Sequence, residues 1–233
     1  MDSDPGSGSE PTGDPRATYD RIASHFAQTR EYAWPEVEAF VAGRSATRAL
    51  DVGCGNGRHT EALAARAGTA VGVDLSRGLL DEAVARARER GFDDAAAFVP
   101  GDAAALPLRD DAVDLAVYVA ALHHLSPRER RIESLNELAR VLAPGGVALV
   151  SAWSTAHDRF DRDEGFDTTV DWTLPGGETV PRFYHVYDPA EFREDLAESD
   201  LAVEETFTAS GNCYARVRGG PPGETRGPSR SPR

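Results

Sequence analysis

Three glycines at alternating positions follow an aspartate in the stretch LDVGCGNG, residues 50–57. Glycine has no Cβ, so Gly53, Gly55 and Gly57 allow the backbone to turn tightly and a ligand to touch it. In doubly wound sheets, ligands bind at the carboxyl ends of the strands, where the first loop must permit such contact. The same pattern also suits a tight strand-to-helix turn without a ligand. The acidic residues nearby are therefore needed to distinguish a binding loop from a structural turn.

Two further acids close the next two predicted strands. Asp74 ends TAVGVD, where one carboxylate can accept from both hydroxyls of a ribose, and Asp102 ends AAAFVPGD, where it can accept from an amine such as adenine N6. Together with Asp51, these acids predict a nucleoside site. A nicotinamide dinucleotide is disfavoured, because its fingerprint requires a glycine where the chain has Arg58.

The elements that must position these residues alternate between strands and helices. Apolar runs predict strands at 46–52, 69–74, 95–102, 113–122, 145–153, 201–209 and 212–218, and helical spacing predicts helices within 18–41 and at 59–67, 77–90 and 127–142, with another starting at Asp188. Apolar runs without alternation are typical of parallel strands buried on both faces. We therefore expect an α/β fold, a doubly wound, mostly parallel sheet with helices on both faces.

The chain has the length and apolar content of one domain, with 233 residues of which 40% are hydrophobic. Residues 1–15 and 219–233 are rich in Gly, Pro and Ser, so we expect two disordered tails around a single domain at 16–218. Residues 153–187 interrupt the alternation and carry many Gly, Asp and aromatic residues. We expect them to form a loop over the site.

The charge is strongly acidic, with 39 Asp and Glu against 25 basic residues, and all 25 are arginine because the sequence contains no lysine. This composition resembles proteins of salt-accumulating halophiles, although an acidic protein from a GC-rich genome is an alternative. The net charge of −14 argues against loose, charge-driven binding of nucleic acid. At molar salt, however, the Debye length is about 3 Å, so local arginines decide which partners bind.

Several classes of protein are disfavoured. No apolar run is long enough to cross a bilayer and the N-terminus is acidic, so we expect a soluble, cytoplasmic protein without a membrane partner. Cys54 and Cys213 lie far apart, and no short Cys/His spacing is available for zinc. Neither a disulfide framework nor a metal site is predicted.

The motifs together resemble a known family. Residues 51–57, Asp74, Gly101-Asp102 and the LAPGG of residues 142–146 are similar to the successive motifs of class I S-adenosylmethionine-dependent methyltransferases, and the resemblance covers residues 47–152. It implies a Rossmann-like fold and S-adenosylmethionine as cofactor. By this resemblance the cofactor-binding residues are Gly53, Gly55 and Gly57 around the methionine part, Asp51 near its amino group, Asp74 with the neighbouring Leu75 at the ribose, and Asp102 with Ala103 at the adenine.

The flanking segments resemble one branch of these enzymes. Residues 19–37, 121–126 (ALHHLS), 182–187 (RFYHVY) and 211–214 (GNCY) are similar to methyltransferases that esterify the carboxymethyl group on the wobble uridine of tRNA. That family usually has Trp where this chain has Cys213. The resemblance implies binding of the tRNA anticodon loop, and a small zinc-binding activator subunit that adds a strand to the edge of the sheet.

The chemistry of a carboxylate acceptor agrees with these segments. A carboxylate is already nucleophilic at pH 7, so it needs no strong base and must instead be held in line with the methyl group. Arginine grips a carboxylate by two parallel hydrogen bonds. The predicted catalytic residues are therefore Arg30 and Arg182. His124 and His185 are predicted to bond the acceptor or the uracil edge rather than to act as bases. Three aromatic residues could stack on an unpaired base or belong to the core: Trp172, Phe183 and Tyr184.

Two other functions stay open. A small-molecule methyltransferase acting on a quinone, fatty acid or amine is favoured by the acidic composition and by the absence of a basic stripe in the sequence. A non-catalytic module that binds S-adenosylmethionine is a third reading, disfavoured by the completeness of the donor motifs.

Overall fold

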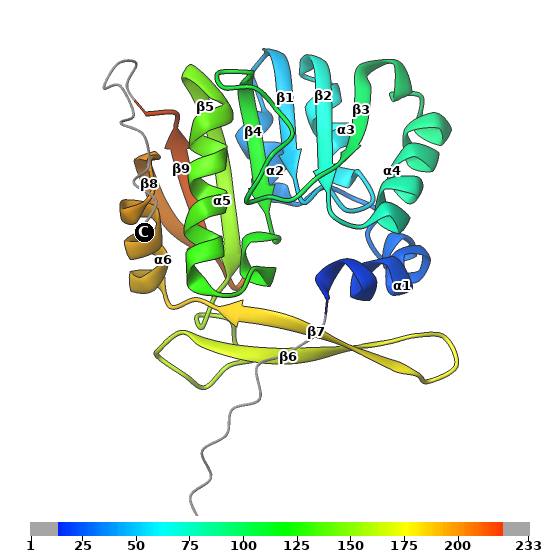
Figure 1. The fold of residues 1–233 in the computed structure, drawn as a ribbon, viewed down its shortest axis with the longest axis vertical. Helices are drawn as coiled ribbons and strands as arrows, with labels where there is room; N and C mark the ends of the chain where they lie inside the picture. The colour runs from blue at the N-terminus through cyan, green and yellow to red at the C-terminus, as the bar shows by residue number, and fades with distance from the viewer. Residues whose placement is uncertain (1–13, 221–233) are drawn as a thin grey trace, which may run out of the picture.

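The computed structural model describes residues 14–220, which form a seven-stranded sheet with the order β3-β2-β1-β4-β5-β9-β8 (Figure 1). Neighbouring strands are parallel from β3 to β5, whereas β9 is antiparallel to both β5 and β8. The predicted α/β, mostly parallel sheet is confirmed. Its strands are β1 (Ala46–Val52), β2 (Ala67–Asp74), β3 (Ala96–Pro100), β4 (Val113–Val119), β5 (Leu142–Trp153), β8 (Ala202–Ala209) and β9 (Asn212–Arg218).

Helices cover both faces of the sheet (Figure 1). They are α1 (Pro15–Gln28), α2 (Pro35–Val41), α3 (Arg58–Ala64), α4 (Arg77–Arg90), α5 (Arg128–Val141) and α6 (Pro189–Glu198), with short 3-10 turns at Asp93–Ala95 and Leu122–His124. Alternate residues of one strand point to opposite faces. In β1, Leu50 therefore packs in a core with Leu138 of α5, and Ala49 packs in a second core with Phe40 of α2.

Capping residues set several helix boundaries as predicted. Ser76 Oγ accepts from the Leu79 nitrogen at 3.1 Å at the start of α4, and Gly91 ends that helix with φ 72°. Asp188 accepts from two backbone nitrogens at the start of α6. The helix predicted at 59–67 ends earlier, because the chain re-enters the sheet as β2, whose Ala67 pairs with Ala46.

Residues 153–187 are not the loop that the sequence predicted. They contain a two-stranded antiparallel hairpin, β6 (Phe166–Thr173) and β7 (Thr179–Val186), which lies across the carboxyl ends of the parallel strands (Figure 1). The exposure of β6 alternates strictly, which is the pattern of a strand with one wet face. The turn between the strands contains Gly176 and Gly177, both with positive φ. The segment does lie over the site, as expected.

The expected ends of the domain shift slightly. Helix α1 already begins at Pro15, where Asp14 accepts a hydrogen bond from the Arg16 nitrogen. At the other end, the Gly219 nitrogen donates to the Gly146 carbonyl at 3.2 Å. The rest of the two predicted tails, residues 1–13 and 221–233, lies outside the described residues. Within residues 14–220, no helix has the length and apolar character needed to cross a membrane.

Candidate functional site

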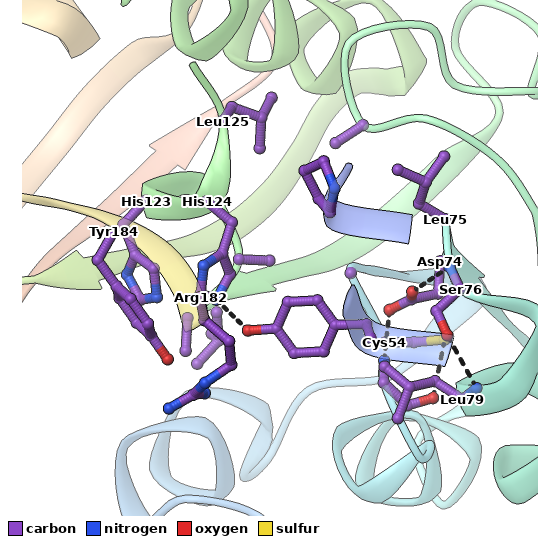
Figure 2. A pocket seen from close by; sticks show the side chains of 18 of the residues that line it. Cys54, Asp74, Leu75, Ser76, Leu79, His123, His124, Leu125, Arg182 and Tyr184 are labelled. Carbon is purple, nitrogen blue, oxygen red and sulfur yellow. Dashed lines mark hydrogen bonds between the residues drawn. The ribbon is translucent and has the colours of Figure 1, made fainter. Parts of the chain in front are cut away.

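A cavity of about 700 Å³ lies at the carboxyl ends of the parallel strands, lined by residues of the sheet, of α1 and of β7. Its size is ordinary for a site that holds a small molecule. Figure 2 shows two groups of side chains on opposite sides of it. One group contains Asp74, Leu75 and Ser76, and the other contains His123, His124, Arg182 and Tyr184.

The glycine loop after β1 forms part of the first side. Gly53 has φ +66°, and a Cβ there would lie 2.3 Å from the Cβ of Ala121, so only glycine fits. Asp74 orders the loop, since its two carboxylate oxygens accept from the Gly55 nitrogen and the Ser76 nitrogen, each at 2.8 Å. Burial raises the pKa of Asp74. Gly53, Gly55 and Asp74 all line the cavity.

Two predicted cofactor residues lie behind the loop rather than on the cavity wall. Asp51 is 1% exposed, and its carboxylate accepts a hydrogen bond from Thr60 Oγ1 at 2.7 Å. Burial raises the pKa of Asp51 to about 7. Gly57 is the N-cap residue of α3 with φ +77°, and a Cβ there would press on Phe98. These two residues shape the loop, and neither is among the residues that line the cavity.

The remaining predicted donor residues line the cavity near the ends of β2 and β3. Leu75 is 40% exposed although it is apolar, so one face of the cavity offers an uncovered hydrocarbon surface. Asp102 and Ala103 lie on the wall as well. The Asp102 carboxylate forms an ion pair with Arg130 at 2.6 Å and accepts from the Ala104 nitrogen at 2.9 Å, leaving lone pairs free on both oxygens.

His124 is held by two hydrogen bonds on the opposite side. Its Nδ1 lies 2.9 Å from the Phe183 carbonyl, which can only accept, so Nδ1 carries the proton. The Nε2 therefore accepts from the Tyr19 hydroxyl at 2.8 Å. Burial lowers the pKa of His124 to about 4, and burial also lowers that of the adjacent His123. Both imidazoles are neutral at pH 7 and already bonded to protein groups, since His123 Nδ1 accepts from the Trp153 nitrogen.

Alternation along β7 separates the predicted residues of that strand. Arg182 and Tyr184 line the cavity, whereas Phe183 and His185 do not. The two nitrogens of His185 lie 2.7 Å from an Asp167 oxygen and 2.8 Å from a Glu191 oxygen. His185, which was predicted to bond the acceptor, does not line the cavity: its Nδ1 hydrogen-bonds Asp167, and its Nε2 lies beside Glu191 of α6 without a hydrogen bond.

Arginines without a carboxylate partner gather at the cavity. Arg182 is only 8% exposed, and its Nε has no hydrogen-bond partner among the described residues. Its guanidinium lies 4.9 Å from the Trp172 ring, and that of Arg30 lies 5.6 Å from the same ring. Arg58 and Arg159 line the cavity too; in residues 14–220, none of the four forms an ion pair, whereas Arg130 does. The cavity therefore favours an anion.

Helix α1 connects the two sides of the cavity. Near its start, Asp20 accepts from Ser76 Oγ at 2.7 Å and from the Gly78 nitrogen at 2.9 Å, which binds α1 to α4. At its end, the Asn56 amide of the glycine loop donates to the Ala27 and Arg30 carbonyls. Trp172 of the hairpin donates from Nε1 to His25 at 3.0 Å. The donor loop, α1 and the hairpin thus form a continuous set of contacts.

Several cavity residues were not predicted from the sequence. Tyr19 and Phe26 are spaced by seven residues, which places them on one face of α1, and this spacing was the available signal. His123 was not among the predicted residues, although it lines the wall together with His124. Of the proposed stacking rings, Tyr184 lines the cavity and Trp172 does not. The unpredicted lining residues include Cys54, Asn56, Arg58, His59, Trp153, His157, Arg159 and Asn212.

Comparisons with known proteins agree on one family. A family model described as a methyltransferase domain matches residues 50–150. A putative methyltransferase of Encephalitozoon cuniculi is 31% identical over 205 residues, which are 84% of this chain and 91% of that protein. The tRNA (carboxymethyluridine(34)-5-O)-methyltransferase ALKBH8 of Mus musculus is 39% identical over 137 residues, which are 58% of this chain and 19% of that protein. This chain thus spans about a fifth of the length of such relatives.

Solved structures share the fold. One is a chain of the complex between the Haloferax volcanii Trm112 methyltransferase activator and the putative methyltransferase. It is 18% identical with a TM-score of 0.64, and the match covers 89% of this chain and 98% of that chain.

Proposed function

Because this chain belongs to the class I S-adenosylmethionine-dependent methyltransferases, we propose that it esterifies the carboxylate of 5-carboxymethyluridine at the wobble position of tRNA. The observation that carries the proposal is Arg182, a cation that is 8% exposed, lines the cavity and has no carboxylate partner among the described residues. A buried, unpaired charge is costly, so an anionic substrate is the natural partner. The activity named for the mouse relative supplies the substrate.

The cavity residues suit S-adenosylmethionine. The uncovered face of Leu75 matches the flat adenine, and the free lone pairs of Asp102 suit its amine. Asp74 offers two oxygens to the ribose hydroxyls beside a glycine loop that allows close approach. The bound cofactor supplies a methyl group on a positively charged sulfur. In this proposal Gly53, Gly55, Asp74, Leu75, Asp102 and Ala103 contact the cofactor, while Asp51 and Gly57 hold the loop.

The acceptor carboxylate would lie between Arg182 and Arg30. Both guanidiniums contact the Trp172 ring, so they can approach one anion from two sides. Two positioned arginines would hold the oxygen within attacking distance of the methyl group, roughly 3 to 3.5 Å. Burial lowers the pKa of Arg30, and Arg182 acts in the same direction, so a bound carboxylate would relieve their mutual repulsion.

No general base is needed at this site. The attacking carboxylate is ionised at pH 7, and the transfer leaves no proton to remove. His124 has no free position for this task, since both of its ring nitrogens are bonded to protein groups. We assign His124 a positioning role, in which it orients Tyr19 and anchors β7 through the Phe183 carbonyl. Acting on tRNA, the enzyme would work in the cytoplasm.

The activator is proposed to bind at β3. The sheet has two edge strands, β3 and β8. β8 carries Glu204 and Glu205, each paired with an arginine of β9, and charges of this kind discourage added strands. β3 has the sequence AAFVP without a charged side chain. The small zinc-binding subunit that we propose as the activator would therefore add its strand at β3; a methyltransferase activator is named in the Haloferax volcanii complex.

The direct test is nucleoside mass spectrometry of tRNA from a strain that lacks this gene and from its parent. We expect the methyl ester of carboxymethyluridine to disappear and the free acid to accumulate. Purified protein, alone and with an activator, should methylate an anticodon stem-loop that carries carboxymethyluridine, but not one that carries uridine. An unchanged tRNA profile would overturn the tRNA assignment, and methylation of a small carboxylic acid instead would identify the alternative acceptor.

A further inference from the structure

Asn212 places an unused hydrogen-bonding group at the cavity. The residue starts β9, lines the cavity and is 7% exposed. Its Nδ2 donates to the Ser210 carbonyl at 2.9 Å, and because that carbonyl can only accept, the bond fixes which amide atom is nitrogen. The other atom, Oδ1, has no partner among the described residues and is not among their fully enclosed polar atoms. It therefore opens towards the cavity.

An aromatic cluster begins at the strand partner of Asn212. Asn212 pairs directly with Trp153 of β5, and residues opposite each other in antiparallel strands project their side chains on the same face. The Trp153 ring contacts the rings of His157 and Tyr184, with centroids 5.8 and 4.9 Å apart. Gly211 makes room for this arrangement, since a Cβ there would lie 2.4 Å from His157 Cδ2.

The same wall leads to the arginine proposed for the acceptor. The Arg182 guanidinium lies 5.1 Å from the Tyr184 ring, so Asn212, Trp153, Tyr184 and Arg182 follow one another along the cavity. A flat ring that carries a carboxylate would place its acid at Arg182 and its far edge near Asn212. One free acceptor and one free N–H of the Asn212 amide would face that edge.

Such an amide matches uracil and not cytosine. Uracil has an N3–H donor next to the O4 acceptor, whereas N3 of cytosine carries no hydrogen. We propose that Asn212 accepts the N3–H of the wobble base and so makes the site specific for uridine, an inference that rests on the proposed function. A base without this N3–H would leave the buried Asn212 oxygen unpaired. The cost of an unpaired buried polar group discriminates strongly between two bases.

The experiment compares two anticodon stem-loops in the full-length protein with its activator. One carries 5-carboxymethyluridine at the wobble position, and the other carries the same base methylated at N3. We expect the unaltered protein to use the N3-methyl RNA about 10- to 100-fold less well in kcat/KM, the range for loss of one buried hydrogen bond. In Asn212→Leu, which keeps the branching of the side chain at Cγ and removes its polar atoms, the ratio between the two RNAs should fall to about threefold or less.

Controls separate this inference from the proposed function and from folding. Asn136→Leu changes an asparagine of α5 whose Oδ1 accepts from the Asp200 nitrogen, and the two RNAs should differ in this variant as in the unaltered protein. Titration with S-adenosylmethionine should give the same affinity in Asn212→Leu. If the unaltered protein methylates both RNAs equally, Asn212 does not read N3–H, although the proposed function stands. If it methylates neither RNA, the proposed function itself has failed. Should Asn212→Leu not fold, equal methylation of the two RNAs by the unaltered protein would still overturn the inference.

Discussion

Replacing Arg182 by methionine should slow methyl transfer and leave the fold at least as stable. The guanidinium is 8% exposed and lies 4.9 and 5.1 Å from the rings of Trp172 and Tyr184, with no carboxylate partner within residues 14–220. Methionine retains an unbranched apolar stem that can pack against the same rings. The substitution thus removes the charge and the hydrogen bonds while the wall of the cavity keeps its shape.

The effects on stability and on methyl transfer can be estimated from these contacts. Burying an uncompensated ion costs several kcal/mol, and each cation–π contact returns about 0.5–2 kcal/mol. The unfolding free energy should then be unchanged within about 1 kcal/mol or higher in the variant. For the acceptor, lost bonds to a charged group amount to about 1.5–3 kcal/mol, or about 10- to 100-fold in kcat/KM. Since the carboxylate loses its charge during transfer, most of this loss should appear in KM.

The assays are urea unfolding and methylation of the carboxymethyluridine stem-loop, with Arg128→Met as the matched control. Arg128 lies 2.7 Å from a carboxylate oxygen of the buried Asp195 and 2.8 Å from Glu198, so its loss should lower the unfolding free energy by about 1–2 kcal/mol after allowance for exposure. Its kcat/KM per folded molecule should not change. Arg182→Met with lowered stability and unaltered KM would refute the reasoning, because Arg182 would then be a structural residue.

Three other outcomes follow from the site. Asp74→Ala should weaken S-adenosylmethionine binding about tenfold or more in calorimetric titration, and unchanged heat would contradict its role at the ribose. Burial lowers the pKa of His124 to about 4, below its unfolded value of about 6.5, so the unfolded chain binds more protons between these pH values and stability falls as pH falls through this window. His124→Gln should reduce the dependence of stability on pH, measured as urea midpoints across this window. Burial raises the pKa of Asp51 to about 7, so Asp51 changes stability in the opposite sense, but it does so equally in the variant and the unaltered protein and cancels in their difference. Ala97→Arg on the exposed edge of β3 should prevent copurification with the activator, whereas Val203→Arg on β8 should not.

The donor half of the site could be predicted because its signals are local. Glycines, strand-end acids and the Ser76 cap lie within a few residues of the turns that they shape, so spacing alone placed Asp74 and Asp102 at the cavity. The ion pair between Asp102 and Arg130 could not be predicted this way. It joins the end of β3 to α5, and only the packing of the helix on the sheet brings the two residues together.

The acceptor half was harder because its residues lie on a strand taken for a loop. Arg182 and His185 are three positions apart, so in an extended strand they must point to opposite faces, and both could not contact one ligand. The alternation of Phe166, Val170 and Trp172 with polar residues and the two glycines after Pro175 were the available signals for a hairpin. Given the hairpin, alternation alone would have selected Arg182 and Tyr184 and excluded His185.

Helix α1 makes the two halves of the site thermodynamically dependent on each other. Asn56 in the glycine loop holds the carbonyls of Ala27 and Arg30, while the same helix carries Tyr19 and meets the hairpin at Trp172. A donor that orders the glycine loop also orders the helix that presents Arg30 to the acceptor. By linkage, the factor by which the cofactor raises RNA affinity must equal the factor by which RNA raises cofactor affinity. The demethylated cofactor would then dissociate more readily after the RNA has dissociated.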